Sequence, residues 1–270
     1  MLYNSERLHR LDLERLKDFR LFDDDFFGAV FEHNYECTEL LLNIVLNRND
    51  IKVKTIIRQR EIKSLEGHSI RLDISAEDSE NNLYNCEIQR EDRGNLRLRS
   101  RYYSSLLDST LLKKGESYNK LVPTYVIFFT EKDTVGDGKA LHHYMMKDAD
   151  DNSPLGDNRH IYFINGEYNN EEQPIGKLMH DFKCKSAEEM YFDVLAKRVR
   201  HFKESEGGIR NMCKALEDMR RETAVLERID TYQEMGCKEP EILERIMKKF
   251  NLTKTEANAY FTLSKEETYA

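Results

Sequence analysis

Residues 71–89, RLDISAEDSENNLYNCEIQ, decide the fold. Polar and apolar side chains alternate in both halves of this stretch, as in β-strands, where successive side chains point to opposite faces. Asp73 lies on the polar face of the first half, and Glu87 and Gln89 share the polar face of the second. The residues DSENN between the halves are typical of a turn. The stretch is therefore predicted to form two antiparallel strands joined by a hairpin.

The two acidic residues of this hairpin are predicted to face each other. A turn centred on Glu80 pairs Asp73 directly with Glu87, whereas a register shifted by one or two residues would separate them. Paired side chains in an antiparallel sheet have Cβ atoms about 4.5–5.5 Å apart, so their like charges repel. A hard divalent cation such as Mg²⁺ would remove the repulsion, because it prefers carboxylate and carbonyl oxygens. Gln89 would orient a metal-bound water towards phosphorus, which is the chemistry of phosphodiester hydrolysis.

An ordinary solvated face of an antiparallel sheet is the alternative interpretation, because Asp, Glu and Gln are common there. The neighbouring sequence favours the metal site. Residues 90–101 contain two acidic residues and five arginines, Arg90, Arg93, Arg97, Arg99 and Arg101. A basic patch beside paired carboxylates matches what a nuclease requires, neutralised phosphates and an activated water.

The segments around the hairpin predict an α/β fold. Apolar residues at three-and-four spacing between Phe27 and Val45 predict one amphipathic helix, which begins after three aspartates. A strand over residues 51–60 precedes the hairpin, and a helix over 95–115 follows it, with Leu98 and Tyr102 on its apolar stripe. Three more strands are then predicted, the first nearly all apolar and so buried on both faces: 121–130, Leu141–Met146 and His160–Asn165.

The last third of the chain changes character. From Ser186 onward the apolar spacing is that of helices, so the chain is predicted to divide into residues 1–185 and a helical region over residues 186–270. Two of the helical stretches, Ala187–Phe202 and Ile209–Ile229, suggest self-association. A homodimer is therefore one hypothesis.

Composition and charge limit the function classes. The 270 residues include 42 Lys and Arg against 50 Asp and Glu, a formal net charge of −8, so any DNA contact requires a local basic patch. No apolar stretch approaches the roughly 20 residues of a membrane helix, and residues 1–20 lack the apolar region of a secretory signal, so a cytoplasmic protein without membrane contact is expected. Five cysteines without a Cys-x-x-Cys pair are typical of reduced thiols. No Gly-rich phosphate loop is present, and no small-molecule organic cofactor is expected.

Three segments of the chain resemble a known family. They are RLDISAEDSENNLYNCEIQR at 71–90, RSRYYSSLLDSTLLKKGESYNKL at 99–121 and TYVIFFTEKDTVGDGKALHHY at 124–144. These segments are similar to the PD-(D/E)XK nuclease family transposases, also called recombination-promoting nucleases, and the resemblance extends over about residues 20–220. It implies a restriction-endonuclease-like core of order α-β-β-β-α-β, with a mixed sheet flanked by helices and a helical C-terminal region. It also implies a part in DNA recombination or in the movement of mobile elements.

The resemblance implies roles for individual residues of the hairpin. Asp73 and Glu87 become the metal-binding acids, and the backbone carbonyl of Ile88 becomes a further metal ligand. Gln89 takes the position where many nucleases of the superfamily have a lysine. Lysine stabilises the reacting phosphate through its charge, whereas glutamine positions groups by hydrogen bonds alone.

Residues outside the hairpin complete the implied site. A carboxylate from the first helix often contributes in the wider superfamily. The candidates are Glu32, Glu36 and Glu39 within the helix and Asp25 at its start, although Asp24 and Asp25 also suit a helix N-cap. Arg99 and Arg101 become DNA contacts, with a salt bridge at the rim of the site as the alternative.

Two functions are consistent with these residues. The first is a Mg²⁺- or Mn²⁺-dependent DNA endonuclease in which Asp73 and Glu87 bind the metal and Gln89 aligns the water. The second is a catalytically weak or silent relative that keeps the fold and binds DNA or protein. Gln89 in the lysine position and the net charge of −8 motivate the second hypothesis.

Overall fold

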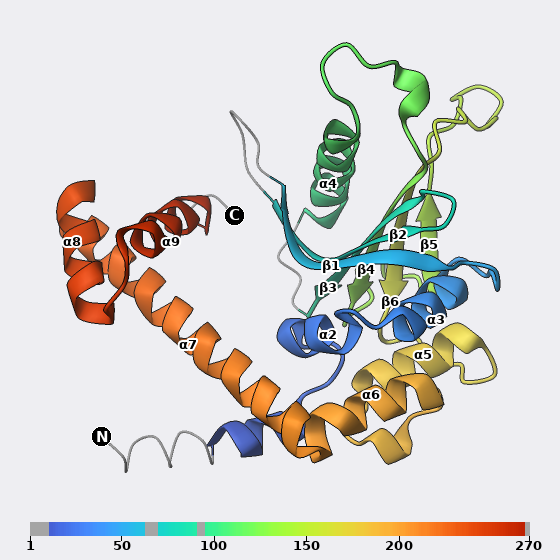
Figure 1. The fold of residues 1–270 in the computed structure, drawn as a ribbon. Coiled ribbons are helices and arrows are strands. Elements are labelled where there is room, and N and C mark those ends of the chain that lie inside the picture. The colour runs from blue at the N-terminus through green and yellow to red at the C-terminus, as the bar shows by residue number, and fades with distance from the viewer. Residues whose placement is uncertain (1–10, 63–69, 91–94, 268–270) are drawn as a thin grey trace.

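A mixed sheet forms the centre of the molecule (Figure 1). The computed structural model describes residues 11–62, 70–90 and 95–267. In this part of the chain the strands are β1 (Val53–Ile62), β2 (Ile70–Asp78), β3 (Leu83–Gln89), β4 (Thr124–Thr130), β5 (Leu141–Tyr144) and β6 (Arg159–Asn165). They form one six-stranded sheet in the order β1-β2-β3-β4-β6-β5, with β1 to β3 as an antiparallel meander and β4 and β6 parallel to β3. β4 lies inside the sheet and is almost entirely buried, as its apolar sequence predicts.

Helices cover both sides of the sheet. One side carries α2 (Asp24–Phe31), α3 (Tyr35–Val45), α5 (Pro174–Lys183) and α6 (Asp193–Glu204), and the other carries α4 (Leu96–Leu111) (Figure 1). Each side has its own apolar cluster against the sheet. Two 3₁₀ helices, Tyr118–Lys120 and Ala187–Glu189, lie in connecting segments. The predicted α-β-β-β-α-β core with flanking helices is confirmed.

The prediction of a single first helix is wrong, because the chain breaks it into α2 and α3. His33 adopts a left-handed backbone conformation with φ of 54°, which an α-helix does not accommodate. Asn34 then caps α3 by accepting a hydrogen bond from the Cys37 N–H at 3.0 Å. The apolar spacing continues across the break, so spacing alone does not reveal it.

The apolar stripe predicted for α4 is right at Leu107, which is buried, and at Leu106, which packs against the same cluster, but it is wrong in the first half of the helix. Leu98 is 53% exposed and Tyr102 is 36% exposed, whereas Ser100 and Ser104 are buried. Small side chains let the helix backbone approach the sheet, so the buried face is chosen by fit as well as by hydrophobicity. The helix is thereby rotated so that Arg99 lines the same cleft as the hairpin acids.

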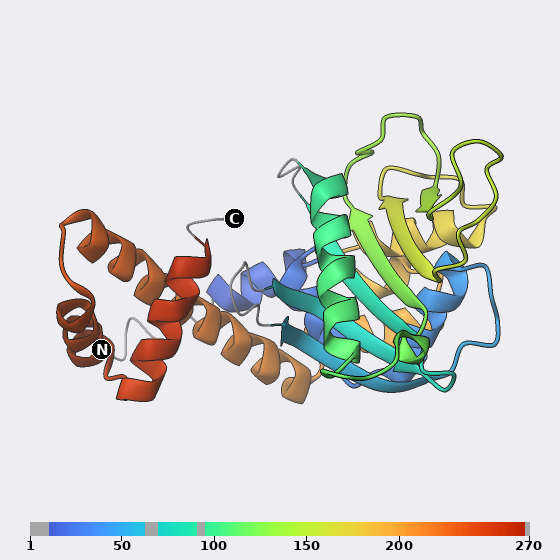
Figure 2. The ribbon, with the colours of Figure 1, turned by 90° about the horizontal axis from the view of Figure 1, so that it is seen from above.

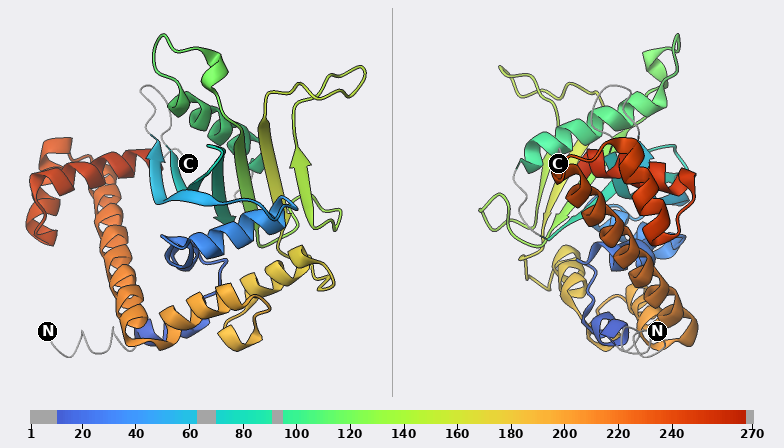
Figure 3. Two further views of the ribbon diagram at one scale, coloured as in Figure 1. Left: turned by 45° about the vertical axis from the view of Figure 1, so that its right-hand side comes forward. Right: turned by 90° about the vertical axis from the view of Figure 1, so that its left-hand side faces the viewer.

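The C-terminal helices extend away from the sheet, as Figure 2 and the left panel of Figure 3 show. They are α7 (Glu206–Glu234), α8 (Glu239–Phe250) and α9 (Lys254–Glu267). The beginning of α7 packs in the core beneath the sheet, whereas its end forms a separate apolar cluster with α8 and α9 that includes Val225, Ile246 and Phe261. None of the helices in the described residues is long and apolar enough to span a membrane.

Candidate functional site

Asp73 and Glu87 lie next to each other at the end of the β2–β3 pairing. Backbone pairing of the two strands reaches Ile74–Cys86, in the register that a turn centred on Glu80 predicts. One residue farther, the Asp73 N–H donates to Oε1 of Glu87 at 3.0 Å, and the Ile88 N–H donates to Oδ2 of Asp73 at 2.9 Å. Carboxylate oxygens thus replace backbone carbonyls as acceptors, which fixes both side chains.

Both carboxylates are held in a setting that disfavours their charge. The pKa of Asp73 is raised to about 7, chiefly by burial and also by the nearby Asp24 carboxylate, although the hydrogen bond from the Ile88 N–H lowers it. Burial and the charge of Asp73 also raise the pKa of Glu87 well above its ordinary value. Two facing acids of this kind repel each other when ionised, so they form a ready site for a cation.

A cleft of about 500 Å³ opens beside these acids. Its walls carry aspartates from the start of α2, basic side chains and part of α4; they include Arg15, Asp23, Asp24, Asp25, Arg71, Asp73, Glu87, Ile88, Gln89, Arg90, Arg99 and Tyr103. The structure therefore brings Asp73, Glu87, Ile88 and Gln89 together with Arg99 and Asp25, as the sequence predicts for one site. Arg93 of the predicted basic patch lies outside the described residues.

Gln89 is oriented by Arg99. The guanidinium Nη1 of Arg99 donates to the side-chain Oε1 of Gln89 at 2.8 Å. The same guanidinium lies over the rings of Tyr103 and Phe128, 5.6 Å and 5.5 Å from their centroids, which fixes its position. Within the described residues the Nε2 of Gln89 is buried and has no hydrogen-bond partner, so this donor is unused beside the cleft.

The first-helix acids have different partners. The carboxylate of Glu39 accepts hydrogen bonds from Lys52 Nζ at 2.8 Å and the Val53 N–H at 3.0 Å, and it does not line the cleft. The carboxylate of Asp25 lines the cleft but lies 3.6 Å from Arg58. The structure therefore brings Asp25 to the site and leaves Glu39 outside it.

The interpretation of Asp24 or Asp25 as the N-cap is wrong, because α2 begins at Asp24 and Asp23 is the N-cap residue. The Asp23 carboxylate instead accepts hydrogen bonds from Arg90 at 2.6 Å and the Arg20 N–H at 2.7 Å. Asp24 lines the cleft and raises the pKa of Asp73, so its charge acts on the hairpin acid. Sequence reasoning missed this placement; the three consecutive aspartates are its only signal.

Arg101 lies apart from Arg99. It is exposed on the outer side of α4 and lines a separate groove of about 470 Å³, together with Tyr102, Tyr144 and Arg159. The two arginines are two residues apart on one helix, so they point in different directions. The structure thus joins Arg99 to the hairpin site and leaves Arg101 on a neighbouring surface.

Helix α7 forms a second wall beside the hairpin acids. A cavity of about 390 Å³ is lined by Asp24, Arg71 and Asp73 on one side and by Asp218 and Glu222 of α7 on the other. Arg71 Nη1 lies 3.6 Å from Oε1 of Glu222. Asp73 lines both cavities, so the C-terminal helix borders the candidate site. The sequence carries no signal for this contact, which depends on how α7 docks.

Comparison with protein families matches residues 23–235 to the PD-(D/E)XK nuclease family transposases. The chain belongs to this family. The matched residues run from the acidic start of α2 through the hairpin and α4 to the end of α7. The resemblance seen in the sequence is therefore confirmed. Comparison with curated proteins finds no match, and comparison with solved structures finds none.

Nucleases of the PD-(D/E)XK group typically use divalent metal ions. The residues of this chain fit such an ion, because Asp73 and Glu87 present carboxylate oxygens side by side in a setting that raises both of their pKa values. Ile88 lines the cleft as well, and its backbone carbonyl is the further metal ligand that the resemblance implies. Family membership also implies a DNA substrate.

Proposed function

We propose that this chain is a metal-dependent DNA endonuclease in which Asp73, Glu87 and the carbonyl of Ile88 hold Mg²⁺ or Mn²⁺. The observation that carries the proposal is the direct juxtaposition of the two hairpin carboxylates at the cleft. When bound, the metal supplies Lewis-acid stabilisation of phosphate charge and a water of lowered pKa. The protein supplies the fixed acids, the polar contacts around them and the arginines that hold the nucleic-acid backbone.

Gln89 and Arg99 together take the place of the superfamily lysine in this proposal. Because Gln89 Oε1 accepts from Arg99, its Nε2 is left to donate to a phosphate oxygen or to the attacking water. Arg99 adds a permanent positive charge within the same cleft. Gln89 would orient the reacting groups by hydrogen bonds and Arg99 would neutralise phosphate charge, whereas a single lysine would do both.

Asp24 is the first-helix acid that the geometry favours. Asp24 and Asp25 both line the two cavities that border Asp73, and the charge of the Asp24 carboxylate raises the pKa of Asp73. Glu39 lines neither cavity. A third acid near the metal increases the affinity of the site for a divalent cation. We therefore assign Asp24 to the metal site alongside the hairpin acids.

A catalytically weak or silent nuclease-fold protein is the second candidate function. The contact between Arg71 and Glu222 favours it. Arg71 lines the cleft and would otherwise bind phosphate, but its guanidinium is paired with the Glu222 carboxylate. Such a protein would bind DNA or a protein partner without efficient cleavage.

Cleavage of supercoiled plasmid separates the two candidates. The wild-type chain is incubated with Mg²⁺ or Mn²⁺, beside an EDTA control, Asp73→Asn, and Asp151→Asn as a matched change on an exposed loop. Asparagine keeps an acceptor for the Ile88 N–H, so Asp73→Asn removes charge with little loss of fold. Nicking that is lost with EDTA and Asp73→Asn, and kept in Asp151→Asn, supports the endonuclease. A folded wild-type protein that binds metal and cuts nothing supports the silent relative.

The remaining features of the proposal concern the setting of the protein. The proposal includes a role in DNA recombination, which the resemblance implies, and a cytoplasmic location, with which the free state of all five cysteines accords. The division at residue 185 and a homodimer formed through Ala187–Phe202 and Ile209–Ile229 stay predictions. Light scattering at the concentrations used for cleavage tests the dimer, and a monomer throughout would exclude it.

A further inference from the structure

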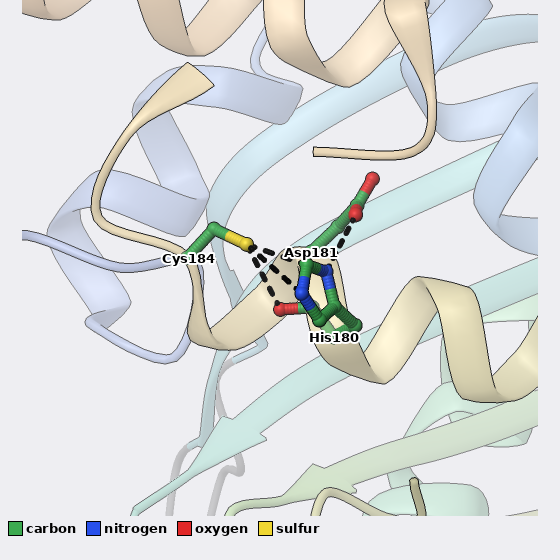
Figure 4. Close-up of side chains that lie close together, drawn as sticks. All are labelled: His180, Asp181 and Cys184. Atoms are coloured by element: carbon green, nitrogen blue, oxygen red, sulfur yellow. Dashed lines mark hydrogen bonds and ion pairs between the residues drawn. The ribbon is translucent and has the colours of Figure 1, made fainter. Parts of the chain in front are cut away.

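Three metal-ligating side chains meet at the end of α5, away from the hairpin site. They are His180, Asp181 and Cys184, whose donor atoms all lie within 4.8 Å of one another (Figure 4). Nδ1 of His180 is 3.4 Å from Oδ1 of Asp181 and 3.4 Å from Sγ of Cys184. None of the three lines either cavity beside Asp73.

Two of the three spacings among these atoms match the edges of a zinc tetrahedron. Zn²⁺ binds nitrogen and oxygen at about 2.0–2.2 Å and sulfur at about 2.3 Å, so two ligand atoms of a tetrahedral site lie about 3.3–3.6 Å apart. Both distances from Nδ1 of His180 fall in this interval. Sγ of Cys184 is also 4.0 Å from Nε2, so it lies over the ring, and the His180 ring must turn for Nδ1 to face an ion shared with Sγ. The ligand set also suits zinc rather than magnesium, because thiolate and imidazole are donors that Mg²⁺ avoids.

The surroundings hold the Asp181 carboxylate in place. Its side chain is fully buried, and it accepts the Tyr191 N–H on Oδ1 at 2.7 Å and the Phe192 N–H on Oδ2 at 2.9 Å. Each carboxylate oxygen keeps a second lone pair for another partner. Hydrogen bonds of this kind are what orient ligating carboxylates in metal sites. The His180 ring packs against Tyr191 with centroids 4.8 Å apart and remains 32% exposed, which leaves access from solvent.

We propose that Nδ1 of His180, Oδ1 of Asp181 and Sγ of Cys184 bind one Zn²⁺, with water as the fourth ligand. On binding, the Cys184 thiol loses its proton to solvent and gives up its hydrogen bond to the His180 carbonyl, which is 3.3 Å long. The site ties the end of α5 to residues 191–192, the segment that leads into α6. The bound ion would stabilise the packing of α5 against the segment that leads into α6.

Cobalt titration tests this site without reference to nuclease activity. Co²⁺ in a tetrahedral site with a thiolate ligand gives a sulfur-to-metal charge-transfer band and intense visible bands, and Zn²⁺ displaces it. The full-length chain under reducing conditions is expected to bind one Co²⁺ with these bands. Cys184→Ser should abolish the charge-transfer band, and His180→Gln should weaken zinc binding by about 10²-fold. Cys237→Ser, at the partly exposed cysteine, and Asp73→Asn, in the hairpin site, should leave both unchanged.

Several outcomes would overturn the zinc site. They are a wild-type spectrum without a thiolate band, a band that Cys184→Ser retains, or a band that Cys237→Ser removes. Cobalt bound only through oxygen and lost in Asp73→Asn would assign the metal to the hairpin acids instead. If Cys184→Ser does not fold by circular dichroism, the zinc content and spectrum of His180→Gln decide the matter.

Discussion

Arg99 donates a hydrogen bond to the side-chain oxygen of Gln89 at 2.8 Å, so the amide of Gln89 has one defined orientation. The arginine itself packs against both the Tyr103 and the Phe128 rings, which are in contact with each other. A glutamine without this partner would present either its oxygen or its nitrogen to the reacting groups. Pairing with Arg99 therefore fixes the Gln89 amide so that its Nε2 is the hydrogen-bond donor at the site, next to the permanent positive charge of the guanidinium.

Arg99→Gln is expected to lower the cleavage rate by about 10²-fold, because it removes both the orientation of Gln89 and a charge near the phosphate. DNA affinity, measured by fluorescence anisotropy, should change much less than the rate. Arg97→Gln removes a charge from the same helix without touching Gln89 and serves as the control. Equal effects of the two variants on rate would show that Arg99 contributes only general charge.

The raised pKa of Asp73 predicts how stability depends on pH. An acid whose pKa rises from 3.8 to about 7 on folding binds its proton more tightly in the folded chain, so stability falls as pH increases from about 4 to about 7. Asp73→Asn removes this cost, and at pH 8 without metal it should raise the free energy of unfolding by about 4 kcal/mol at most. Urea unfolding in EDTA measures the difference. A variant less stable than the wild type at pH 8 would contradict a cost of ionising the buried Asp73 carboxyl.

Divalent metal should relieve the same repulsion. Millimolar Mg²⁺ or Mn²⁺ is expected to raise the melting temperature of the wild type at pH 8, because a ligand that binds only the folded state stabilises it. The rise should vanish in Asp73→Asn and shrink in Asp24→Asn. Asp25→Asn, whose carboxylate lies near Arg58, is the matched control. A metal-dependent rise that survives in Asp73→Asn would place the cation elsewhere.

The hairpin and its register were predictable because they are local. Alternation and one turn are enough to bring Asp73 beside Glu87, and the structure has that register. The order of strands and helices follows from similar short-range patterns. The break at His33 was not predictable from spacing, because the apolar phase continues through it.

Features that depend on how helices pack against the sheet could not be predicted from the sequence. The buried face of the first half of α4 is set by how closely Ser100 and Ser104 let it approach the sheet, so the prediction from hydrophobicity failed at Leu98 and Tyr102. The joining of Arg99 to Gln89 follows from that rotation. Glu222 reaches the hairpin only because α7, more than a hundred residues farther along the chain, packs beside it. No local sequence pattern predicts such a contact.

Asp181 has a structural role that can be measured apart from any metal. Its buried carboxylate accepts the Tyr191 and Phe192 N–H groups at the approach to α6. Asp181→Ala leaves both donors unsatisfied and is expected to cost about 2–4 kcal/mol in urea unfolding with EDTA present. Asp181→Asn should cost less because one acceptor remains. Asp193→Ala, at the exposed first residue of α6, is the control, and an equal loss there would contradict the role of Asp181.

The contact between Arg71 and Glu222 predicts a restraint on nucleic-acid binding. Glu222 adds a negative charge beside the cleft and lies 3.6 Å from a side chain that would otherwise meet phosphate. Glu222→Gln should therefore tighten DNA binding about fivefold at low salt, the equivalent of about 1 kcal/mol for one exposed pair. Arg71→Gln should weaken binding, and the double variant should behave like Arg71→Gln because the glutamate acts through the arginine. Glu227→Gln, an exposed change on the same helix, controls for net charge. An equal gain in Glu227→Gln would reduce the effect to net charge and exclude a restraint through Arg71.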